Sequence, residues 1–480
     1  MIAGLTPHPS YYDSGIPWLG AVPGHWEVLP IGAIGRLFKG NGGSKEDEAP
    51  FGVPCVRYGD LYTSHQSFIS RARSFVTPER SAAYTHIRFG DVLFAASGET
   101  IEEIGKSAVN LIASDAVCGG DVLVLRPDRK FVPRFLGYAA DATPTVHQKA
   151  STGRGFTVVH IYASQLKRVV IAVPPLREQA AIVHFLDHAD RRIRRYIRAK
   201  QKLIKLLEEQ KQAIIHRAVT RGLDPRVRLK PSGVAWLEDV PEHWEVRRAK
   251  DLFRDVDCRS ATGQEVLLSL RMRQGLVPHG EVSTVLVAAD QLVGFKKVEP
   301  GQIVMNRMRA ATGIFGVVNR AGLVSPDYAV LEPIAHLDPV YFLRLFKTPA
   351  LGAIFRMESK GLGTGSSGFM RLYGDRFGSI KLPVPPPNEQ ARIVRDIAAR
   401  TWEADGAQER ASRAISLLGE YRTRLIADVV TGKLDVREAL VSVPDDVDGP
   451  EPFAVGDDLL VDEAPDDEGD LVGVADEDAL

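Results

Sequence analysis

An internal duplication constrains this chain more than any other feature of its sequence. The pattern SGxxWLxxVPxHWEV occupies Ser14–Val28 and returns 218 positions later in Ser232–Val246. A second pair, VPPLREQA in Val173–Ala180 and VPPPNEQA in Val384–Ala391, lies 211 positions apart. Repeats separated by this distance are whole folded units rather than the short units of a solenoid. The chain is therefore expected to contain two copies of one architecture.

Length and composition describe an ordinary globular protein. The 480 residues suffice for two to four domains, each with its own core. No run of about 18 apolar residues occurs, and the N-terminus lacks a basic region followed by an apolar one, so we expect no membrane segment, no signal peptide and a cytoplasmic location. Cys55, Cys118 and Cys258 are far apart and form no CxxC, which argues against a disulfide framework and predicts no metal site.

The net charge of −1 hides an uneven distribution. From Pro444 onward the chain has 15 acidic and no basic residues, so 46 of the 61 acids remain to face 60 Lys and Arg in residues 1–443, a net charge of +14. Such a surplus suits a surface that binds phosphates, although it is weak support when it stands alone. The acidic tail, 441–480, is predicted to be disordered. It is either a solubilising appendage or a self-inhibitory mimic of nucleic-acid charge.

After Pro174 and Pro175 the pattern becomes helical for some forty residues. Apolar positions recur at alternating steps of four and three, as in a heptad seam, and an offset of 211 gives a matching seam with smaller side chains. The predicted seam positions are Ile182, Leu186, Ala189, Ile193, Tyr196, Lys200, Leu203, Leu207, Gln210 and Ile214 in the first helix, and Ile393, Ile397, Arg400, Ala404, Ala407, Ala411, Ala414, Leu418, Tyr421 and Leu425 in the second.

The two helices are predicted to form a mutual coiled coil. The 42 residues from Leu176 to Arg217 would extend roughly 63 Å, which is longer than a small domain is wide. The alternative is that each amphipathic helix packs on its own domain. Glu178 and Glu389 suit the first turns, and Gly222 and Gly432 mark the ends. If a pseudo-twofold axis relates the units, the helices run antiparallel and act as a spacer.

The stretches between the repeats are rich in short strand-like runs and turns. Asp121–Leu125 and Gln302–Met305 have strand patterns, whereas Tyr341–Phe346 has a helical one. The predicted class is α+β: two globular domains separated by two long helices. Most loops differ between the domains although their frames are alike, as is needed to recognise two unrelated ligand surfaces.

The repeated motifs carry a close family resemblance. SGxxWLxxVPxHWEV, the VPPxxEQ helix start and the ending Thr431–Arg437 resemble the DNA specificity subunit of type I restriction-modification systems. The resemblance spans about Tyr11–Leu440 and implies two target recognition domains, each followed by a long helix. The expected parts are an N-terminal segment with the first repeat, 1–28; recognition domain 1, 29–172; a helical spacer with the second repeat, 173–246; recognition domain 2, 247–383; a C-terminal helical spacer, 384–440; and the tail, 441–480.

The resemblance implies a non-catalytic protein that reads a bipartite, asymmetric target in double-stranded DNA. Two methyltransferase subunits would bind it to form an adenine-methylating complex, and translocase-nuclease (restriction) subunits would add cleavage. S-adenosylmethionine, ATP and magnesium would then belong to those partners, and this chain would hold no cofactor. Arg191–Lys205, with eight basic residues and no acid, is either a solvated helix face, a contact with unread DNA or a contact with an acidic partner subunit.

Candidate DNA contacts are basic, aromatic or glycine-adjacent loop residues. Arginine can bind guanine through two hydrogen bonds, while serine and backbone amides in glycine-rich loops suit phosphates. The candidates are Lys39, Arg57, Tyr58, Lys106 and Arg154 in the first domain, and Arg271, Arg273, Arg307, Arg309, Ser366, Ser367 and Arg371 in the second.

Motifs for catalysis are missing from the sequence. Gly105-Lys106-Ser107 resembles the end of a phosphate loop, but a Walker A motif requires glycine where Thr100 stands. The chain also lacks Asn-Pro-Pro-Tyr, by which adenine methyltransferases hold a flipped base. His25 and His243 are interpreted as parts of a packing corner rather than as catalytic groups. Two alternatives remain: a self-sufficient enzyme such as a nuclease, and a two-lobed scaffold that binds only proteins.

Overall fold

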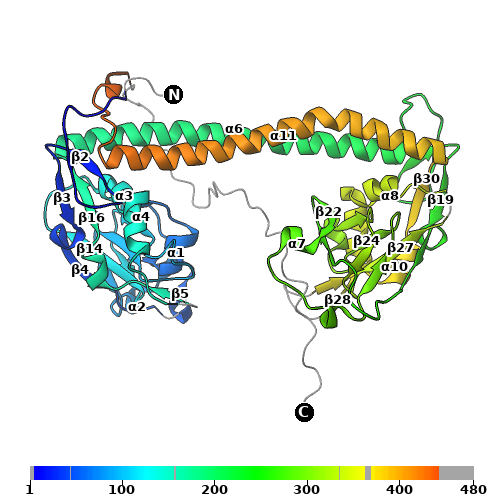
Figure 1. Ribbon diagram of the computed structural model, residues 1–480, viewed down its shortest axis with the longest axis horizontal. Coiled ribbons are helices and arrows are strands. Elements are labelled where there is room, and N and C mark those ends of the chain that lie inside the picture. The colour runs from blue at the N-terminus through cyan, green and yellow to red at the C-terminus, as the bar shows by residue number, and fades with distance from the viewer. Residues whose placement is uncertain (1–4, 44, 156–157, 335, 363–368, 443–480) are drawn as a thin grey trace, which may run out of the picture. The chain divides into compact units, whose positions relative to one another are not determined.

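The computed structural model describes residues 5–43, 45–155, 158–334, 336–362 and 369–442. The chain forms two compact units. Among the described residues, unit 1 combines 5–200 with 413–442, and unit 2 contains 201–412. Helices α6 (Leu176–Arg221) and α11 (Pro387–Val430) each contribute one part to unit 1 and another to unit 2 (Figure 1). The predicted α+β class with two long helices is confirmed.

Unit 1 is built on two five-stranded sheets. The central sheet has the order β4 (Gly35–Lys39), β14 (Val122–Pro127), β10 (Val92–Ala95), β12 (Ser107–Asn110), β7 (Phe68–Ile69). The other sheet has the order β5 (Glu48–Ala49), β8 (Ser74–Val76), β6 (Val53–Val56), β13 (Ala116–Cys118), β9 (Thr85–Ile87). Helices α3 (Pro133–Asp141) and α4 (Thr143–Ala150) follow β14, while α1 (Tyr58–Thr63) and α2 (Pro78–Ser81) are short.

The central sheet of unit 1 is buried on both faces. Alternate residues of β10 and β14, such as Phe94 and Leu123, join one core with Phe135 of α3, and their neighbours Leu93 and Val124 join a second core. A strand enclosed on both sides needs apolar residues at every position. This explains the continuous run Val122–Leu125 that the sequence presents.

Unit 2 repeats this plan with a smaller frame. Its central sheet has the order β20 (Phe253–Asp255), β27 (Ala329–Pro333), β24 (Ile303–Met305), β25 (Phe315–Val317). Helices α8 (Pro339–Phe346) and α9 (Pro349–Glu358) share a core with one face of this sheet. Residues of β21 (Leu268–Arg271), which pairs with β22 (Gly275–Pro278), and of β23 (Lys296–Val298), which pairs with β26 (Gly322–Val324), share a core with its other face. The short α7 spans His279–Val282.

The duplicated motif folds in the same way in both units. It forms the hairpins β1 (Tyr11–Asp13)–β2 (Ala21–Pro23) and β17 (Leu229–Pro231)–β18 (Asp239–Pro241). The strand that follows each hairpin pairs with the strand that precedes a long helix: β3 (Glu27–Pro30) with β16 (Val170–Val173), and β19 (Glu245–Arg248) with β30 (Lys381–Val384). Each domain is thus closed at its base by its own first and last strands.

The long helices pair in antiparallel fashion within each unit. In unit 1, Asp190 of α6 binds Arg422 of α11; in unit 2, Lys211 of α6 binds Asp405 of α11 at 2.5 Å. Increasing residue numbers on α6 therefore meet decreasing numbers on α11, as the pseudo-twofold argument predicts. The seam includes these polar side chains as well as apolar ones.

Burial agrees with the predicted seam from Ile182 to Ile193 and at Ala411 and Leu425, but not at every position between. Tyr196 and Leu203 are 55% and 40% exposed, and Ile197, at 2%, takes the buried position instead. Gln210 and Tyr421 are also exposed, next to the seam residues Lys211 and Arg422. Ile193 to Ile197 is a step of four where three was predicted. A rule that selects apolar residues passes over Lys211 and Arg422, because it cannot anticipate ion pairs between the helices.

Replacement of Asp190 is expected to weaken the helix pair of unit 1. Asp190 is 6% exposed and lies between Arg194 (2.6 Å) and Arg422. Asp190→Ala leaves two arginines largely buried without their carboxylate, at a cost of about 3–5 kcal/mol. Faster hydrogen–deuterium exchange at 180–200 and 413–430 measures this loss. Glu332→Ala, which removes the exposed partner of Arg254, is the control and should cost at most about 1 kcal/mol.

The carboxylate of Asp190 also makes the stability of the helix pair depend on pH in acid. Burial alone would raise the pKa of Asp190, but Arg422 and Arg194 outweigh it and the pKa is lowered. The stabilisation is therefore complete above the unfolded pKa of about 3.9 and is lost as the pH falls through the lower folded pKa. Equal acid sensitivity in wild type and Asp190→Ala would contradict this assignment.

Candidate nucleic-acid interface

Each domain brings two loops together at an equivalent place. In unit 1 the amide of Ile161 donates to the carbonyl of Ala96 at 2.9 Å, and in unit 2 the amide of Leu372 donates to the carbonyl of Arg307 at 2.9 Å. Each donor and each acceptor in unit 1 lies 211 positions before its equivalent in unit 2, the same offset as between the VPPxxEQ motifs. The loop after the central strand β10 or β24 therefore meets the segment before α5 (Ala163–Leu166) or α10 (Gly374–Ser379) in both domains.

In unit 1 these loops are fixed by strand pairing and by hydrogen bonds from neighbouring side chains. β11 (Ser97–Gly98) pairs with β15 (Val159–His160), and Tyr62 donates its hydroxyl proton to the carbonyl of Ser97 at 3.1 Å. The ammonium of Lys149 is fully enclosed and donates to the carbonyl of Gly105 at 2.7 Å. Burial lowers the pKa of Lys149 to about 8. The loop 97–106 is thus fixed at both ends by buried polar groups.

The candidates of the first domain differ in how free they are. Lys39, Tyr58 and Arg154 are exposed. Arg57 is half-buried and bound to Glu48 at 2.9 Å, while Lys106 is half-buried and lies 3.3 Å from Asp141. The structure therefore leaves the first three accessible to a ligand and gives the last two an internal partner.

In the second domain Arg307 lies in the loop after β24, and Arg371 is the last residue of β29, directly before Leu372. Each is bound to a carboxylate, Arg307 to Asp255 at 3.0 Å and Arg371 to Asp327 at 3.1 Å. The guanidinium of Arg371 also lies 5.8 Å from the centre of the Tyr373 ring. DNA phosphates or bases would have to replace these carboxylates as partners.

The other candidates of the second domain are distributed differently. Arg273 and Arg309 are exposed, in the β21–β22 turn and after β24. Arg271 is only 6% exposed and is the last residue of β21, so it lies in a strand rather than on an exposed loop. Ser366 and Ser367 lie outside the described residues, between β28 (Lys360–Leu362) and β29 (Phe369–Arg371).

Sequence reasoning missed two further cations near Arg307. Lys296 is 2% exposed, donates to the carbonyl of Tyr328 at 2.9 Å and lies 3.8 Å from Asp257. Burial, followed by the charge of Arg307, lowers the pKa of Lys296. Arg259 also binds Asp257, at 3.0 Å. No local motif marks these residues, because the sheet joins segments about forty positions apart.

The duplicated histidine and tryptophan form a corner with the first turn of each long helix. In unit 1, Glu178 accepts from Trp26 Nε1 at 2.8 Å and lies 2.8 Å from His25 Nε2. In unit 2, Glu389 accepts from Trp244 Nε1 at 3.1 Å and lies 2.7 Å from His243 Nε2. Both tryptophans are buried. The corner is the packing arrangement that the sequence predicts, and it explains the glutamate of VPPxxEQ.

The glutamine of the same motif fastens each domain to its helix. Gln179 accepts from the amide of Val132 at 2.9 Å, and Gln390 accepts from the amide of Asp338 at 2.8 Å. These amides lie just before α3 and at the N-cap of α8. Both glutamines are buried. Each side-chain oxygen therefore gives the backbone N–H a hydrogen-bond acceptor in place of the water that is lost on folding.

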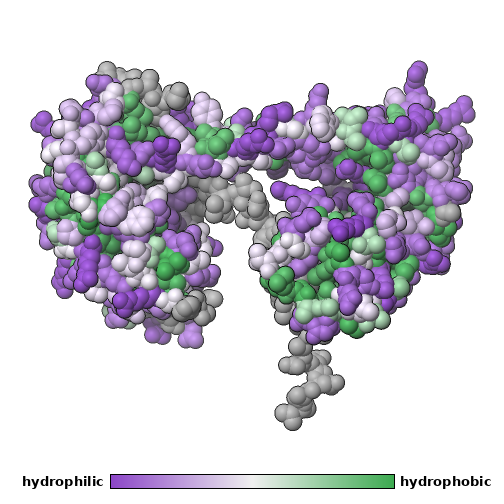
Figure 2. Space-filling model, viewed as in Figure 1, coloured by the Kyte–Doolittle hydropathy of each residue, from purple (hydrophilic) through white to green (hydrophobic). Residues whose placement is uncertain are grey.

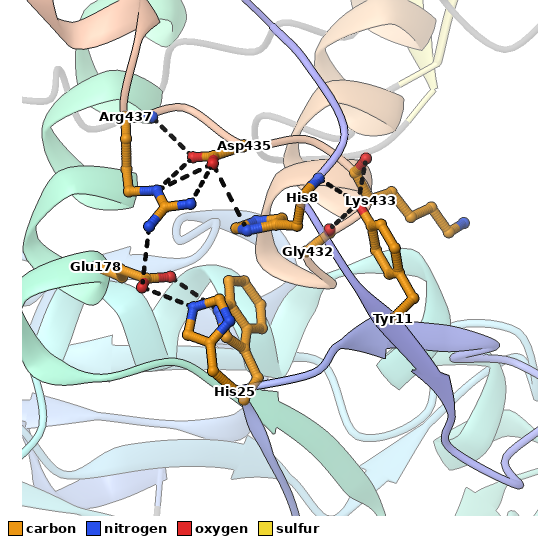
Figure 3. A network of polar contacts seen from close by, with 9 residues as sticks. His8, Tyr11, His25, Glu178, Gly432, Lys433, Asp435 and Arg437 are labelled. Carbon is orange, nitrogen blue, oxygen red and sulfur yellow. Dashed lines mark hydrogen bonds and ion pairs between the residues drawn. The ribbon is translucent and has the colours of Figure 1, made fainter.

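The first corner is completed by the two ends of the chain. Tyr11 donates its hydroxyl proton to the carbonyl of Gly432 at 3.0 Å (Figure 3). The amide of Asp435 donates to the carbonyl of Thr6 at 2.7 Å. In unit 2 the corresponding path from Gly222 to Ser232 is covalent. We call the contact of residues 5–13 with 431–437 the terminal clasp. In unit 1 the terminal clasp joins the end of a long helix to the first hairpin by non-covalent contacts, whereas in unit 2 the peptide chain from Gly222 to Ser232 makes this connection.

A left-handed glycine ends each long helix at these corners. Gly222 has φ +73° and Gly432 has φ +77°. A Cβ atom at Gly432 would lie 2.4 Å from Pro23 and 3.0 Å from Trp26. Only glycine therefore provides both the backbone angle and the close approach.

In Figure 2, hydrophilic side chains predominate on the visible surface of the two long helices, and hydrophobic ones gather in small patches on the second domain. None of the described helices combines the length and the apolar character that crossing a membrane requires.

Comparisons with known proteins agree with this geometry. The profile of a family described as "Type I restriction modification DNA specificity domain" matches residues 23–206. The chain is 20% identical over 435 residues to the type I restriction enzyme EcoKI specificity subunit of Escherichia coli, covering 86% of this chain and 90% of that protein. It is 23% identical over 436 residues to a putative type I restriction enzyme MjaX specificity subunit of Methanocaldococcus jannaschii, covering 87% and 96%.

A solved structure has the same fold. A chain from a study of complex assembly and conformational transition of the type I R-M system superposes with a TM-score of 0.61 at 17% sequence identity, covering 85% of this chain and 98% of that chain. The likeness extends over most of each chain.

Proposed function

We infer that the chain is a DNA specificity subunit of the type I restriction-modification family, in which two domains recognise two separate parts of one DNA target. The carrying observation is the pair of equivalent hydrogen bonds, Ile161 to Ala96 and Leu372 to Arg307. These hydrogen bonds show that the two domains share the same backbone arrangement at this place, while the side chains of the loops differ. A symmetric pair of identical readers would require like residues at like positions.

The differences between the two loop sets favour an asymmetric target. Arg307 stands where the first domain has Ala96, and Arg371 follows the second frame's glycine-rich loop. Arginine reads guanine through paired hydrogen bonds in the major groove, whereas alanine offers none. The two half-sites should therefore have different sequences.

The chain is proposed to act through partner proteins. Two methyltransferase subunits would bind the helices and recognition domains, and translocase-nuclease subunits would join them; S-adenosylmethionine, ATP and magnesium would be held by those subunits. Large apolar side chains on the outer faces of α6 and α11 support such contacts. They include Tyr196, Leu206, Leu417 and Trp402, of which Trp402 is 77% exposed. Exposed aromatic and leucine side chains of this kind are typical of protein interfaces.

Reconstitution tests this division of labour. The purified chain is expected to transfer no methyl group to DNA and to cleave none, whereas the complex with its methyltransferase partner should methylate adenine at one sequence. Radiolabelled S-adenosylmethionine measures the transfer. A mixture that lacks this chain is the control for activity of the partner alone. Methyl transfer by the isolated chain would contradict the proposal.

A further inference from the structure

The terminal clasp brings three metal-binding side chains together. One ring nitrogen each from His8 and His25 and one carboxylate oxygen of Glu178 lie within 4.8 Å of one another. They come from the N-terminal segment, the β2–β3 turn and the first turn of α6, and Figure 3 shows them facing one another beside Asp435 and Arg437. We propose that His8, His25 and Glu178 bind one divalent transition-metal ion, such as Zn²⁺, that fastens the terminal clasp.

The donor set suits zinc. Two imidazoles and a carboxylate are common zinc ligands, and bond lengths of about 2.0–2.2 Å place tetrahedral donors about 3.4 Å apart. His25 Nε2 and Glu178 Oε1 are already 2.8 Å apart. An ion between them would replace the shared proton and require a movement of about an ångström. The side chain of His25 is 41% exposed, which provides an entry path and room for a fourth, water ligand.

His8 is the residue that points to a ligand. It is 6% exposed, and its Nδ1 atom is buried without a hydrogen-bond partner. The nearest acceptor is Asp435 Oδ2 at 3.6 Å. A buried imidazole without a hydrogen bond at one nitrogen is costly, and a carboxylate beside a histidine ring is the usual means of orienting a metal ligand. With the ion on Nε2, the proton of Nδ1 would be left for Asp435, so that each nitrogen of the buried imidazole has a partner.

Arg437 competes with the ion. Its guanidinium binds Asp435 at 2.5 Å and lies 3.8 Å from Glu178 Oε1. This single positive charge offsets part of the negative charge of the two carboxylates. Because the Arg437 side chain is 46% exposed, it can turn toward solvent when a cation arrives. Removing its charge should therefore strengthen metal binding, which is not the effect expected of a residue with only a structural role.

The second corner provides an internal control. His243 and Glu389 form the same pair at 2.7 Å, but among the described residues only the first corner adds a second imidazole. The difference has a structural reason. The second corner is connected by the peptide chain, whereas the first holds separate chain ends that a metal ion could crosslink. Metal binding should thus protect the first corner and leave the second unchanged.

Titration of the chelator-treated full-length protein with Co²⁺ and Zn²⁺ tests the proposal. One equivalent of Co²⁺ should bind with a visible d–d band and no thiolate charge-transfer band, because the site contains no cysteine. Zn²⁺ should displace it. Hydrogen–deuterium exchange should slow at residues 5–28 and 431–440 and stay unchanged at 222–246. Absence of a one-equivalent Co²⁺ spectrum, or equal protection of both corners, would overturn the proposal.

Four variants assign the ligands. His8→Ala and His25→Ala are each expected to weaken Co²⁺ binding by more than about 100-fold, beyond the range typical of residues that only orient a ligand. His25 is exposed enough for its variant to report binding even if His8→Ala opens the clasp. Arg437→Gln should tighten binding, and His243→Ala should leave it unchanged. Retained affinity in His25→Ala, weaker binding in Arg437→Gln or a loss in His243→Ala would show that the ion does not bind here.

Discussion

Replacement of Glu27–Val173 by the matching domain of another specificity subunit is expected to change one half of the DNA target and leave the other half unchanged. The segment contains both β3 and β16, which pair with each other, so the graft carries its own base. The original target should lose methylation in the assembled complex by about 10³-fold or more, the typical ratio of specific to non-specific binding. Sequencing of methylated adenines measures the outcome.

The exchange must preserve the contacts of the first domain with helix α6. Val132 binds Gln179, and Arg134 and Tyr138 bind Asp187, at 2.8 and 2.8 Å. A graft with the same three residues at these positions is therefore the matched design. The control exchanges Glu245–Val384 instead and should alter only the other half-site. A change in both halves from either single exchange would contradict independent reading.

Three heptads added to both long helices are expected to lengthen the unread gap of the target by about one DNA turn. The insertions follow Leu203 in α6 and Gln408 in α11, which face each other because Gln408 Nε2 donates to the carbonyl of Ile204 at 3.2 Å. With a rise of 1.5 Å per residue, 21 residues add roughly 31 Å, which corresponds to about 9 or 10 base pairs. The original spacing should no longer be methylated.

A single inserted heptad is the comparison for this design. It adds about 10 Å, or about three base pairs, and so turns one half-site by roughly a third of a turn around the DNA axis. Because a coiled coil lengthens with little rotation, the single-heptad protein should methylate poorly at every gap length. Methylation of the original target by the three-heptad protein at wild-type rate would show that the helices do not set the spacing.

Much of the fold could be predicted because its strongest signals are local or repeated. Prolines and Glu178 give the start of α6, and left-handed Gly222 gives its end. The short continuous apolar run identifies β14, and the helical spacing of apolar residues identifies α8. The duplicated motif assigns the same corner twice. Each of these signals depends on neighbours along the chain.

Less of the candidate interface could be predicted because it depends on contacts between distant segments. The arginines Arg307 and Arg371 are identifiable by type, but their carboxylate partners Asp255 and Asp327 are set by the sheet. Arg271 is of a residue type that often contacts DNA, and yet it is buried. The three donors of the proposed metal site come from positions 8, 25 and 178, so no spacing rule unites them.

Mapping methylated adenines in the genomes of cells with and without the intact system tests the central claim most directly. Two dissimilar domains in one chain with two long helices predict a single asymmetric motif of two short parts, separated by unread bases and with centres about one DNA turn, roughly 10 bp, apart. This motif should disappear when the chain is deleted. A continuous or palindromic motif, or methylation that persists without this chain, would contradict the account.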